Sequence, residues 1–244
     1  AYWNGLPLTD GGGNTYLNLL DFGSIGSMEL IKGPAGSLYG AGTGGVILLN
    51  SPLVTQDQWE FAAMAGSFGQ RRVQLAQQFH NRKFSLRLQF ASHQYNGYRE
   101  QSAMGRYVLN GDIVVPLTSK TTLPATFFYS DLRYETPGGL TAAQYQTNPR
   151  QARPPAGPNR GAVEQKTAVY NHTPYLGLTY ERDWNNRWST RVGVFGSRSD
   201  FLNPTIRNYE IRKELNFGAR TETSFLLDDS QTSKVTFGAE VQAF

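Results

Sequence analysis

The glycine-rich run Gly40–Gly45 is the clearest candidate for a chemical site, because it fits the G-x-G-x-x-G fingerprint of dinucleotide-binding proteins. In those proteins a helix follows the glycines, and its N-terminus holds the pyrophosphate. Here the β-prone run Val46–Leu49 follows and ends at Asn50-Ser51-Pro52, so that no helix fits. The run Gly11–Gly13 lacks the Gly-Lys-Ser/Thr ending of a phosphate loop. The sequence therefore predicts no nucleotide site. It predicts instead a tight turn between strands at Gly40–Gly45.

Groups that ligate metals or act as acids and bases are scattered along the chain. His80, His93 and His172 have no metal-ligand spacing, and solvated turn or loop positions are predicted for them. The carboxylates of Asp228 and Asp229 fall in a predicted turn, where acid pairs are usually solvated. The chain has no cysteine, which excludes disulfides, thiolate catalysis and iron–sulfur ligation. We predict no catalytic residue, no metal site and no cofactor, and therefore no enzyme.

The composition favours β-structure with many turns. Charged residues make up 17% of the chain and aromatic residues 13%, with 26 glycines. No apolar run is long enough for a transmembrane helix, but a transmembrane barrel stays open because its strands alternate in polarity. The net charge of +4 comes from scattered Lys and Arg without a nucleic-acid-binding module, so nucleic acid is not an expected partner.

The elements that must position these residues are long strands with alternating side chains. Phe84, Leu86, Leu88 and Phe90 alternate with polar or small residues, and Val235–Val241 repeats the pattern. Nine strands are predicted, near residues 57–66, 70–79, 83–95, 104–117, 121–134, 165–181, 187–199, 205–227 and 232–244. Alternation alone fits a soluble sandwich as well as a membrane barrel.

The lengths of the connections favour the barrel. Short turns are predicted near residues 80–82, 118–120, 182–186 and 228–231, and they alternate with mostly longer connections at 94–103, 135–164 and 200–204; Gly66–Gly69 is an exception. Short turns at one end and long loops at the other are typical of outer-membrane barrels. Aromatic residues near strand ends indicate interfacial girdles, with cross-strand pairing as the alternative: Trp59, Phe79, Tyr107, Tyr134, Tyr180, Trp184 and Trp188.

Nine strands do not close a barrel, because single-chain bacterial barrels have an even number of strands. No initiator Met or signal sequence precedes Ala1, and Phe244 interrupts the alternation of Val235–Val241. We therefore expect the chain to be an internal fragment, cut at both ends. Residues 1–52 differ from the rest, with short strands predicted as buried at Met28–Ile31 and Val46–Leu49.

One long stretch of residues 1–52 resembles a known family. Residues Leu19–Gly40 (LLDFGSIGSMELIKGPAGSLYG) and Gly44–Asn50 (GGVILLN) strongly resemble the plug of TonB-dependent receptors. That family has Glu-Val-Leu-Arg-Gly-Pro, then Ser-Leu-Tyr-Gly, then a Gly-Gly-Val-Ile strand, and its Asp-Gly-Val-Pro-Leu pattern is matched by Asn4–Leu8. Lys32 replaces the commoner Arg and loses its bidentate fork, and Asn4 replaces Asp.

The resemblance implies a fold and an interface. The fold is the C-terminal part of a small α/β plug domain over residues 1–54, followed over residues 55–244 by about nine N-terminal antiparallel strands of a transmembrane β-barrel. The intact family has 22 strands. The plug–barrel contacts of the family are carried over to Glu29, Lys32 and Tyr39.

The resemblance also implies a function. Such receptors sit in the outer membrane of Gram-negative bacteria among lipid and lipopolysaccharide, bind a scarce nutrient, most often a ferric siderophore, and are energised by TonB with ExbB and ExbD. In the loop Glu135–Glu164, Arg150, Arg153 and Arg160 attract either an anionic iron chelate or lipopolysaccharide phosphates. The ligand-binding candidates are residues of the plug apex and the loops: Asp10, Asn14, Tyr95, Tyr98, Arg99 and Arg150.

Other functions stay open on the sequence. The nutrient of such a receptor can instead be cobalamin, another metal, haem or a glycan. A passive porin or adhesin-like barrel is a further alternative, although an open pore does not need a plug. A soluble β-sandwich that binds a ligand or acts as a hydrolase is the third.

Overall fold

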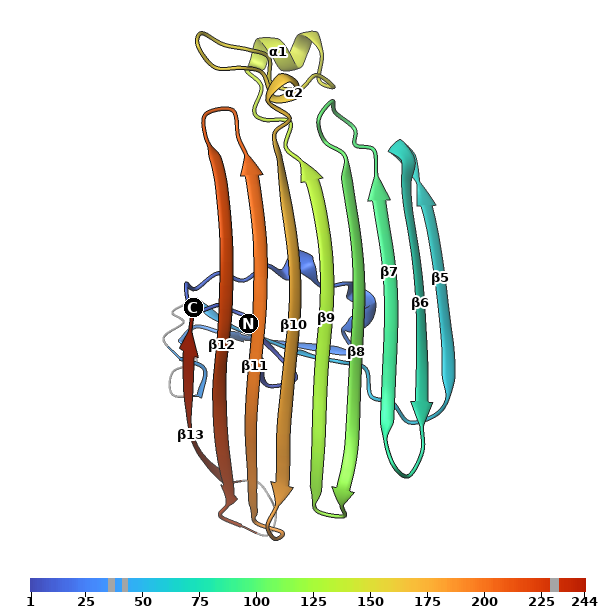
Figure 1. Cartoon of the computed structure of the whole chain (residues 1–244), viewed down its shortest axis with the longest axis vertical. Helices are drawn as coiled ribbons and strands as arrows, with labels where there is room; N and C mark the ends of the chain where they lie inside the picture. The colour runs from blue at the N-terminus through green and yellow to red at the C-terminus, as the bar shows by residue number, and fades with distance from the viewer. Residues whose placement is uncertain (35–37, 41–43, 229–232) are drawn as a thin grey trace.

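An antiparallel sheet of nine strands dominates the computed structural model, which describes residues 1–34, 38–40, 44–228 and 233–244 (Figure 1). The strands lie in the sheet in chain order, from β5 at one edge to β13 at the other. They are β5 (Gln58–Gly66), β6 (Gln70–His80), β7 (Ser85–Tyr95), β8 (Met104–Thr118), β9 (Thr121–Glu135), β10 (Ala168–Asp183), β11 (Trp188–Pro204), β12 (Tyr209–Leu226) and β13 (Lys234–Ala243). The predicted architecture of nine antiparallel strands is confirmed.

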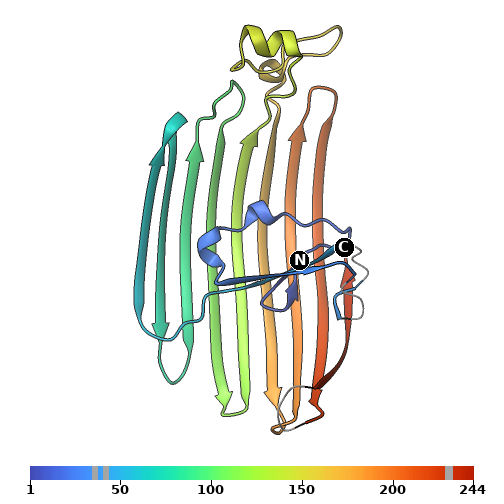
Figure 2. The same cartoon turned by 180° about the vertical axis from the view of Figure 1, so that it is seen from behind.

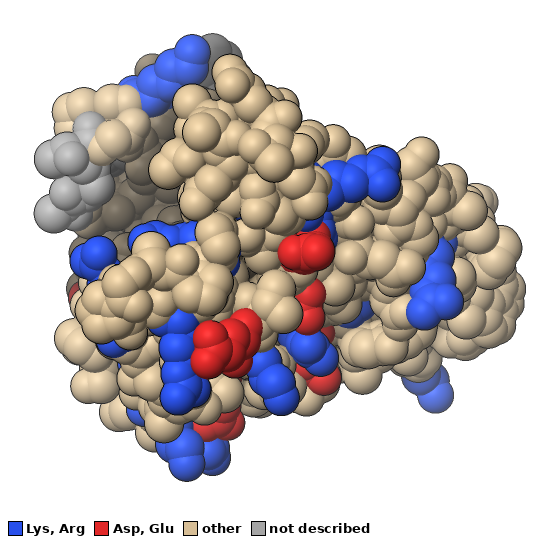
Figure 3. Space-filling model, turned by 90° about the horizontal axis from the view of Figure 1, so that it is seen from above, with Lys and Arg blue, Asp and Glu red and all other residues tan. Residues whose placement is uncertain are grey.

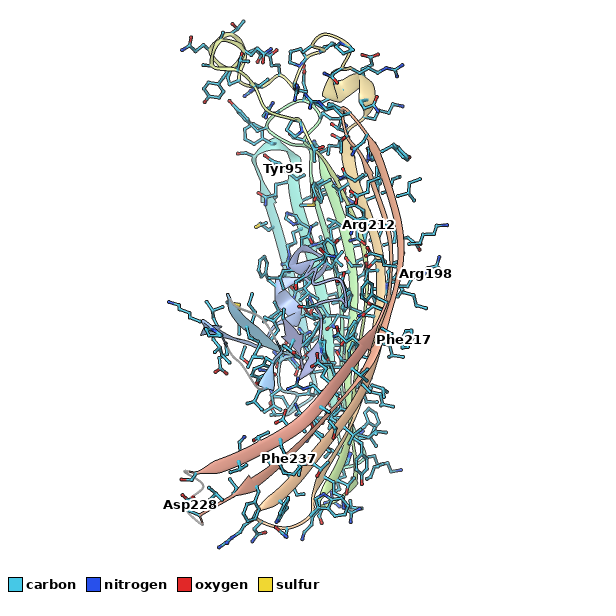
Figure 4. All side chains as sticks on the ribbon, turned by 90° about the vertical axis from the view of Figure 1, so that its left-hand side faces the viewer. Tyr95, Arg198, Arg212, Phe217, Asp228 and Phe237 are labelled. Atoms are coloured by element: carbon cyan, nitrogen blue, oxygen red, sulfur yellow. The ribbon has the colours of Figure 1, made fainter. Side chains whose placement is uncertain are left out.

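Alternation of side chains gives this sheet two different faces. Arg87, Gln89 and Asn110 point toward the N-terminal segment and are buried, whereas Leu88 and Phe90 remain exposed on the opposite face. The sheet is curved, with the N-terminal segment on its concave side and Phe217 on its convex side (Figure 4). A polar concave face and an apolar convex face are those of a membrane-barrel wall, which turns its polar side chains to the lumen.

The connections differ between the two ends of the sheet. At one end they are short, at residues 81–84, 119–120 and 184–187. At the other end, here called the loop end, lie residues 67–69, 96–103, 136–167 and 205–208 (Figure 1). The longest of these contains α1 (Ala142–Thr147) and α2 (Ala162–Gln165). No helix among the described residues is long and apolar enough to span a membrane.

A second sheet lies across the concave face (Figure 2). It has the order β2-β1-β4-β3, and β1 and β4 are parallel. The strands are β1 (Tyr2–Trp3), β2 (Leu6–Pro7), β3 (Ser27–Lys32) and β4 (Gly45–Asn50). The 3₁₀ turns η1 (Leu17–Leu19) and η2 (Phe22–Ser24) lie between β2 and β3. The boundary predicted at residues 54 and 55 falls in the connection between β4 and β5.

The two sheets share one apolar core. Its buried members come from both sheets and from the turns between β2 and β3: Trp3, Leu6, Leu19, Leu20, Leu49, Phe128, Leu132, Tyr175 and Phe195. Full burial of a large apolar side chain contributes about 1.5–3 kcal/mol. The N-terminal segment is therefore packed onto the sheet and is not a loose appendage.

Three expectations about local structure are wrong. The strand at Met28–Ile31 forms as β3 but is not buried, with Met28 69% and Leu30 57% exposed, because β3 is an edge strand that pairs only with β4. Residues 200–204 are not a loop, because β11 pairs with β12 as far as Pro204 and the turn is closed by the Thr205 N–H donating to the Asn208 carbonyl (2.8 Å). The strand predicted to begin near residue 165 begins only at Ala168, after α2.

The glycine-rich run and the aromatic residues can be placed in part. The run Gly40–Gly45 lies partly outside the described residues, but a strand and not a helix follows it at Gly45, as predicted. Trp184 and Trp188 are exposed at the end of the sheet with short turns, where Trp188 packs on Phe225 (4.6 Å between ring centroids). Tyr134 instead packs against the core on the concave face, because it occupies an inward position of β9.

Candidate functional site

A single buried carboxylate joins the N-terminal segment to the sheet. Asp21 is 0% exposed, and its Oδ1 accepts hydrogen bonds from Arg72 Nη2 (2.6 Å) and Gln89 Nε2 (2.9 Å). Its Oδ2 pairs with Arg106 Nη2 at 3.3 Å. The same carboxylate caps η2 by accepting from the Gly23 N–H (2.9 Å). We call Asp21, Arg72, Gln89 and Arg106 the Asp21 latch.

The register of the sheet explains why these side chains meet. Arg72 on β6 lies opposite His93 on β7, which lies opposite Arg106 on β8. All three therefore occupy one transverse row of the concave face. Two cations so placed repel each other, and Asp21 offsets that repulsion at a site where water screens little. The latch thus ties three adjacent strands to one residue of the N-terminal segment.

A hairpin of the N-terminal segment packs on the same concave face of the sheet, farther from the loop end. Asn4 (φ 49°) and Gly5 (φ 80°) form a two-residue turn between β1 and β2, the Asn-Gly type that suits a tight hairpin. Leu6, at the end of this turn, is 2% exposed and packs on Gly177 and Gly193. A Cβ at Gly177 or Gly193 would come within 2.5 Å or 2.4 Å of the Leu6 methyl groups. The two glycines therefore form a socket for this side chain.

Aromatic stacking continues this seat. The Trp3 ring stacks on Phe128 at 5.5 Å, and Phe128 stacks on Tyr175 at 5.2 Å. The Tyr175 hydroxyl donates to the Pro7 carbonyl (3.2 Å). Aromatic pairs of this kind contribute about 0.5–1.5 kcal/mol beyond the area they bury.

A third set of contacts between the N-terminal segment and the nine-stranded sheet is centred on Arg220 of β12. Its guanidinium lies 5.0 Å from the Tyr2 ring centroid and 5.3 Å from that of Tyr39, and donates to the Leu38 carbonyl (2.8 Å) and to Glu240 (2.7 Å). The Tyr2 hydroxyl donates to the same Glu240 carboxylate (3.2 Å). Burial, assisted by the Glu240 charge, raises the pKa of Tyr2 to about 12. Tyr2 therefore remains a neutral donor at any physiological pH.

At the loop end, three connections between strands bring aromatic rings and a cation together. Phe68 packs edge-on against Tyr98 (5.3 Å) and Tyr95 (6.5 Å). The Arg150 guanidinium lies over the Tyr98 ring at 5.2 Å and over the Phe68 ring at 6.0 Å. We call these four residues the rim cluster, and the labelled Tyr95 marks its height in Figure 4.

Comparison with known proteins agrees with the geometry. Residues 1–47 match the TonB-dependent receptor plug domain family. Residues 1–47 are therefore a plug domain of the TonB-dependent receptor type. Among solved structures, its fold is similar to that of the unliganded ferric citrate transporter FecA (TM-score 0.76, 14% identity), the siderophore receptor PiuA from Acinetobacter baumannii (0.74, 16%) and the ferric yersiniabactin uptake receptor FyuA from Yersinia pestis (0.72, 14%). Each match covers 99% of this chain but only 39%, 37% and 38% of those proteins.

In this chain the plug–barrel residues carried over from the family lie in different surroundings. Tyr39 lies against Tyr2 of the plug and Arg220 of the barrel wall. Glu29 and Lys32 are exposed on the edge strand β3, and within the described residues neither forms an ion pair with the wall. Their role in plug retention stays a prediction.

The ligand-binding candidates form two groups. In the plug, Asn14 and Asp10 close a loop on each other, with the Asn14 N–H donating to Asp10 Oδ1 (2.8 Å). Tyr95, Tyr98 and Arg150 belong to the rim cluster. Arg99 donates from Nε and Nη2 to the Gln151 carbonyl (3.1 and 2.9 Å), so its guanidinium fastens one loop to another. A ligand role for any of these residues stays a prediction.

The histidines and acid pairs have ordinary neighbours. His172 Nδ1 lies 3.2 Å from Asp131, and His80 Nδ1 lies 2.9 Å from Ser85 Oγ. The described residues contain no group of three or more His, Asp or Glu arranged to hold a metal ion. Of the predicted acid pair, Asp229 lies outside the described residues.

The contacts of the Asp21 latch and of the Gly177–Gly193 socket were not predicted from the sequence. Asp21 stands in the plug motif, and Arg87 and Gln89 stand on the recognised polar face of a strand, so a signal for polar contacts was present. The particular partners were not predictable, because Arg72 and Arg106 are 51 and 85 residues away from Asp21 in the chain. Phe68 was missed because it lies in a short turn that carried no ligand-like pattern.

Proposed function

We propose that this receptor imports a ferric siderophore or a related iron chelate across the outer membrane of a Gram-negative bacterium. In this proposal the chelate binds at the loop end, and the plug moves to let it pass. The observation that carries the proposal is the plug segment seated on the concave, polar face of the wall through the Asp21 latch. A passive pore has no need of such a segment.

The nature of the seat supports an energised mechanism. Asp21 is fully buried between two arginines, and separating a buried ion pair costs about 3–5 kcal/mol. The core around Trp3 and Leu6 adds to that cost. Ligand binding at the rim touches neither contact, so work must come from elsewhere, and TonB with ExbB and ExbD is the proposed source.

The convex face of the sheet and the long loop support a proposed position in the outer membrane. The apolar convex face, with Leu176 and Phe217 exposed, is proposed to meet outer-membrane lipid. Arg153 and Arg160, on the long loop at the loop end, are proposed to meet lipopolysaccharide phosphates.

Uptake of labelled ferric chelates tests the proposal. Cells that lack other receptors would carry the full-length parent gene, with and without TonB, and would be given chelates of several chemical classes. Uptake that requires both the receptor and TonB is the expected result. Equal uptake without TonB would refute active import, and uptake of cobalamin, haem or a glycan in place of iron would refute the substrate.

A further inference from the structure

The rim cluster has a geometry that ordinary loop packing does not require. Its rings and its cation come from three separate connections: Phe68 from the turn between β5 and β6, Tyr95 and Tyr98 from β7 and the loop after it, and Arg150 from the long loop between β9 and β10. Phe68 and Tyr98 are each 42% exposed. The three connections thus present a partly open aromatic surface at the loop end.

Phe68 is held in a conformation that is unfavourable for a bulky side chain. Its backbone is left-handed, at φ 57° and ψ 35°, and the neighbouring Gly69 shares this region. Such a conformation is unfavourable for a non-glycine residue and persists where surrounding contacts enforce it. Here the Asn96 N–H donates to the Phe68 carbonyl (2.9 Å). In this conformation the ring packs against Tyr98 and lies under the Arg150 guanidinium.

The charge of Arg150 is available to a ligand. Its side chain is exposed, and no carboxylate among the described residues pairs with its guanidinium. Other arginines of the same loop end are engaged: Arg99 with the Gln151 carbonyl, and Arg160 with Glu164 (3.6 Å). Basic and acidic side chains are interspersed on this end of the molecule (Figure 3), so the feature that sets Arg150 apart is its two rings and not a general positive field.

The backbone beside Arg150 is fixed in place. The Glu100 N–H donates to the Arg150 carbonyl (2.8 Å), and the Glu100 carboxylate accepts from the Ala152 N–H (3.2 Å). The Gln101 side chain donates to the Thr167 carbonyl (3.1 Å), which fastens the other end of the long loop. The site is therefore built before a ligand arrives, which lowers the entropy that binding must overcome.

We infer that Phe68, Tyr98 and Arg150 form a recognition site for an aryl-bearing iron chelate, one whose metal ligands are catecholate or phenolate oxygens. Such a ligand is both flat and anionic. Its ring stacks against the exposed aromatic surface, and its oxygen charge meets the Arg150 guanidinium. An aliphatic hydroxamate or a carboxylate chelate uses only part of this site. The inference rests on the proposed function and narrows its substrate class.

Binding to the purified full-length receptor tests the inference with three probes: a ferric tris-catecholate, a ferric tris-hydroxamate and ferric citrate. The variants are Tyr98→Ala, Arg150→Gln and Phe68→Gly, the last of which removes the ring while suiting the left-handed backbone. Matched controls at the loop end are Tyr145→Ala in the long loop and Arg207→Gln in the turn between β11 and β12, at exposed positions outside the rim cluster.

The expected result is preferential binding of the tris-catecholate, weakened about ten- to one-hundredfold by Arg150→Gln, as for a lost charge-assisted contact. Tyr98→Ala and Phe68→Gly weaken it as well, and the controls do not. Equal or tighter binding of the hydroxamate or citrate overturns the inference, as does catecholate binding that ignores all three variants. TonB-dependent uptake of one of those other iron chelates would then leave the proposed function standing, whereas loss of iron uptake of every kind removes both.

Discussion

Replacing Asp21 by Asn should loosen the plug from the wall. The substitution keeps the shape of the side chain but removes the only charge that offsets Arg72 and Arg106 in the latch. Their side chains are only 18% and 11% exposed, so both cations are left poorly solvated. Breaking a buried ion pair costs about 3–5 kcal/mol, and the remaining exposure of the two arginines puts the expected effect at about 3 kcal/mol. This corresponds to a roughly hundredfold larger population of the detached plug.

The detached population can be read from chemical labelling. Ser130 is buried on the concave face of β9, and its hydroxyl has no hydrogen-bond partner in the described structure. Ser130→Cys in the full-length receptor, freed of any other cysteine, therefore reports plug opening without breaking a described contact. When reclosing is faster than labelling, the labelling rate follows the open population. Asp21→Asn should raise the maleimide labelling rate about a hundredfold.

Two further variants make the result decisive. Asp10→Asn removes a half-buried plug carboxylate that lies outside the latch and accepts from Asn14, and it should leave the labelling rate unchanged. Combining Asp21→Leu with Arg72→Met and Arg106→Met removes all three charges, and slow labelling should return, because an apolar replacement of a buried charge network is often neutral or stabilising. A rate for Asp21→Asn within about threefold of the parent would refute the latch, since a contact worth that little cannot retain the plug.

Three other predictions concern the seat and the two faces of the wall. Gly193→Ala places a Cβ 2.4 Å from Leu6 and should lower the stability of the receptor by about 1–3 kcal/mol in thermal unfolding. The loss should be smaller when Leu6 is also replaced by Ala. An unchanged melting temperature for Gly193→Ala would contradict the socket. The pKa of Tyr2 is raised from 10.0 to about 12, so the stabilisation from its neutral hydroxyl is present below pH 10.0 and is lost as pH rises through about 12. The tyrosinate absorbance that Tyr2→Phe removes should therefore titrate near 12. Titration near 10.0 would contradict the burial of Tyr2. Leu176→Arg, on the convex face, should cost about 2–4 kcal/mol in a bilayer, and unchanged stability there would argue against lipid contact.

The strands could be predicted from the sequence because their signal is local. In Leu86–Phe90 every second side chain is apolar, and that period of two sets both the strand and its two faces. The plug motif likewise placed β3 and β4. The burial of β3 was predicted wrongly, because the apolar residues Met28 and Leu30 do not reveal which strand lies at the edge of a sheet.

The sites depend on contacts between distant residues, and here the sequence was less informative. Asp21 meets Arg106 across 85 positions, and Arg220 meets the Leu38 carbonyl across 182. Register decides which polar side chains of neighbouring strands share a row, and no local pattern encodes it. The left-handed backbone of Phe68 is also hidden in the sequence, because bulky residues rarely adopt it.

In the proposed mechanism TonB displaces the plug during import, and labelling of Ser130→Cys in living cells detects that displacement. The cells would express the full-length receptor and be supplied with the ferric chelate that they import. Labelling is expected to become faster only when both the chelate and TonB are present. Equal labelling in cells without TonB would contradict it.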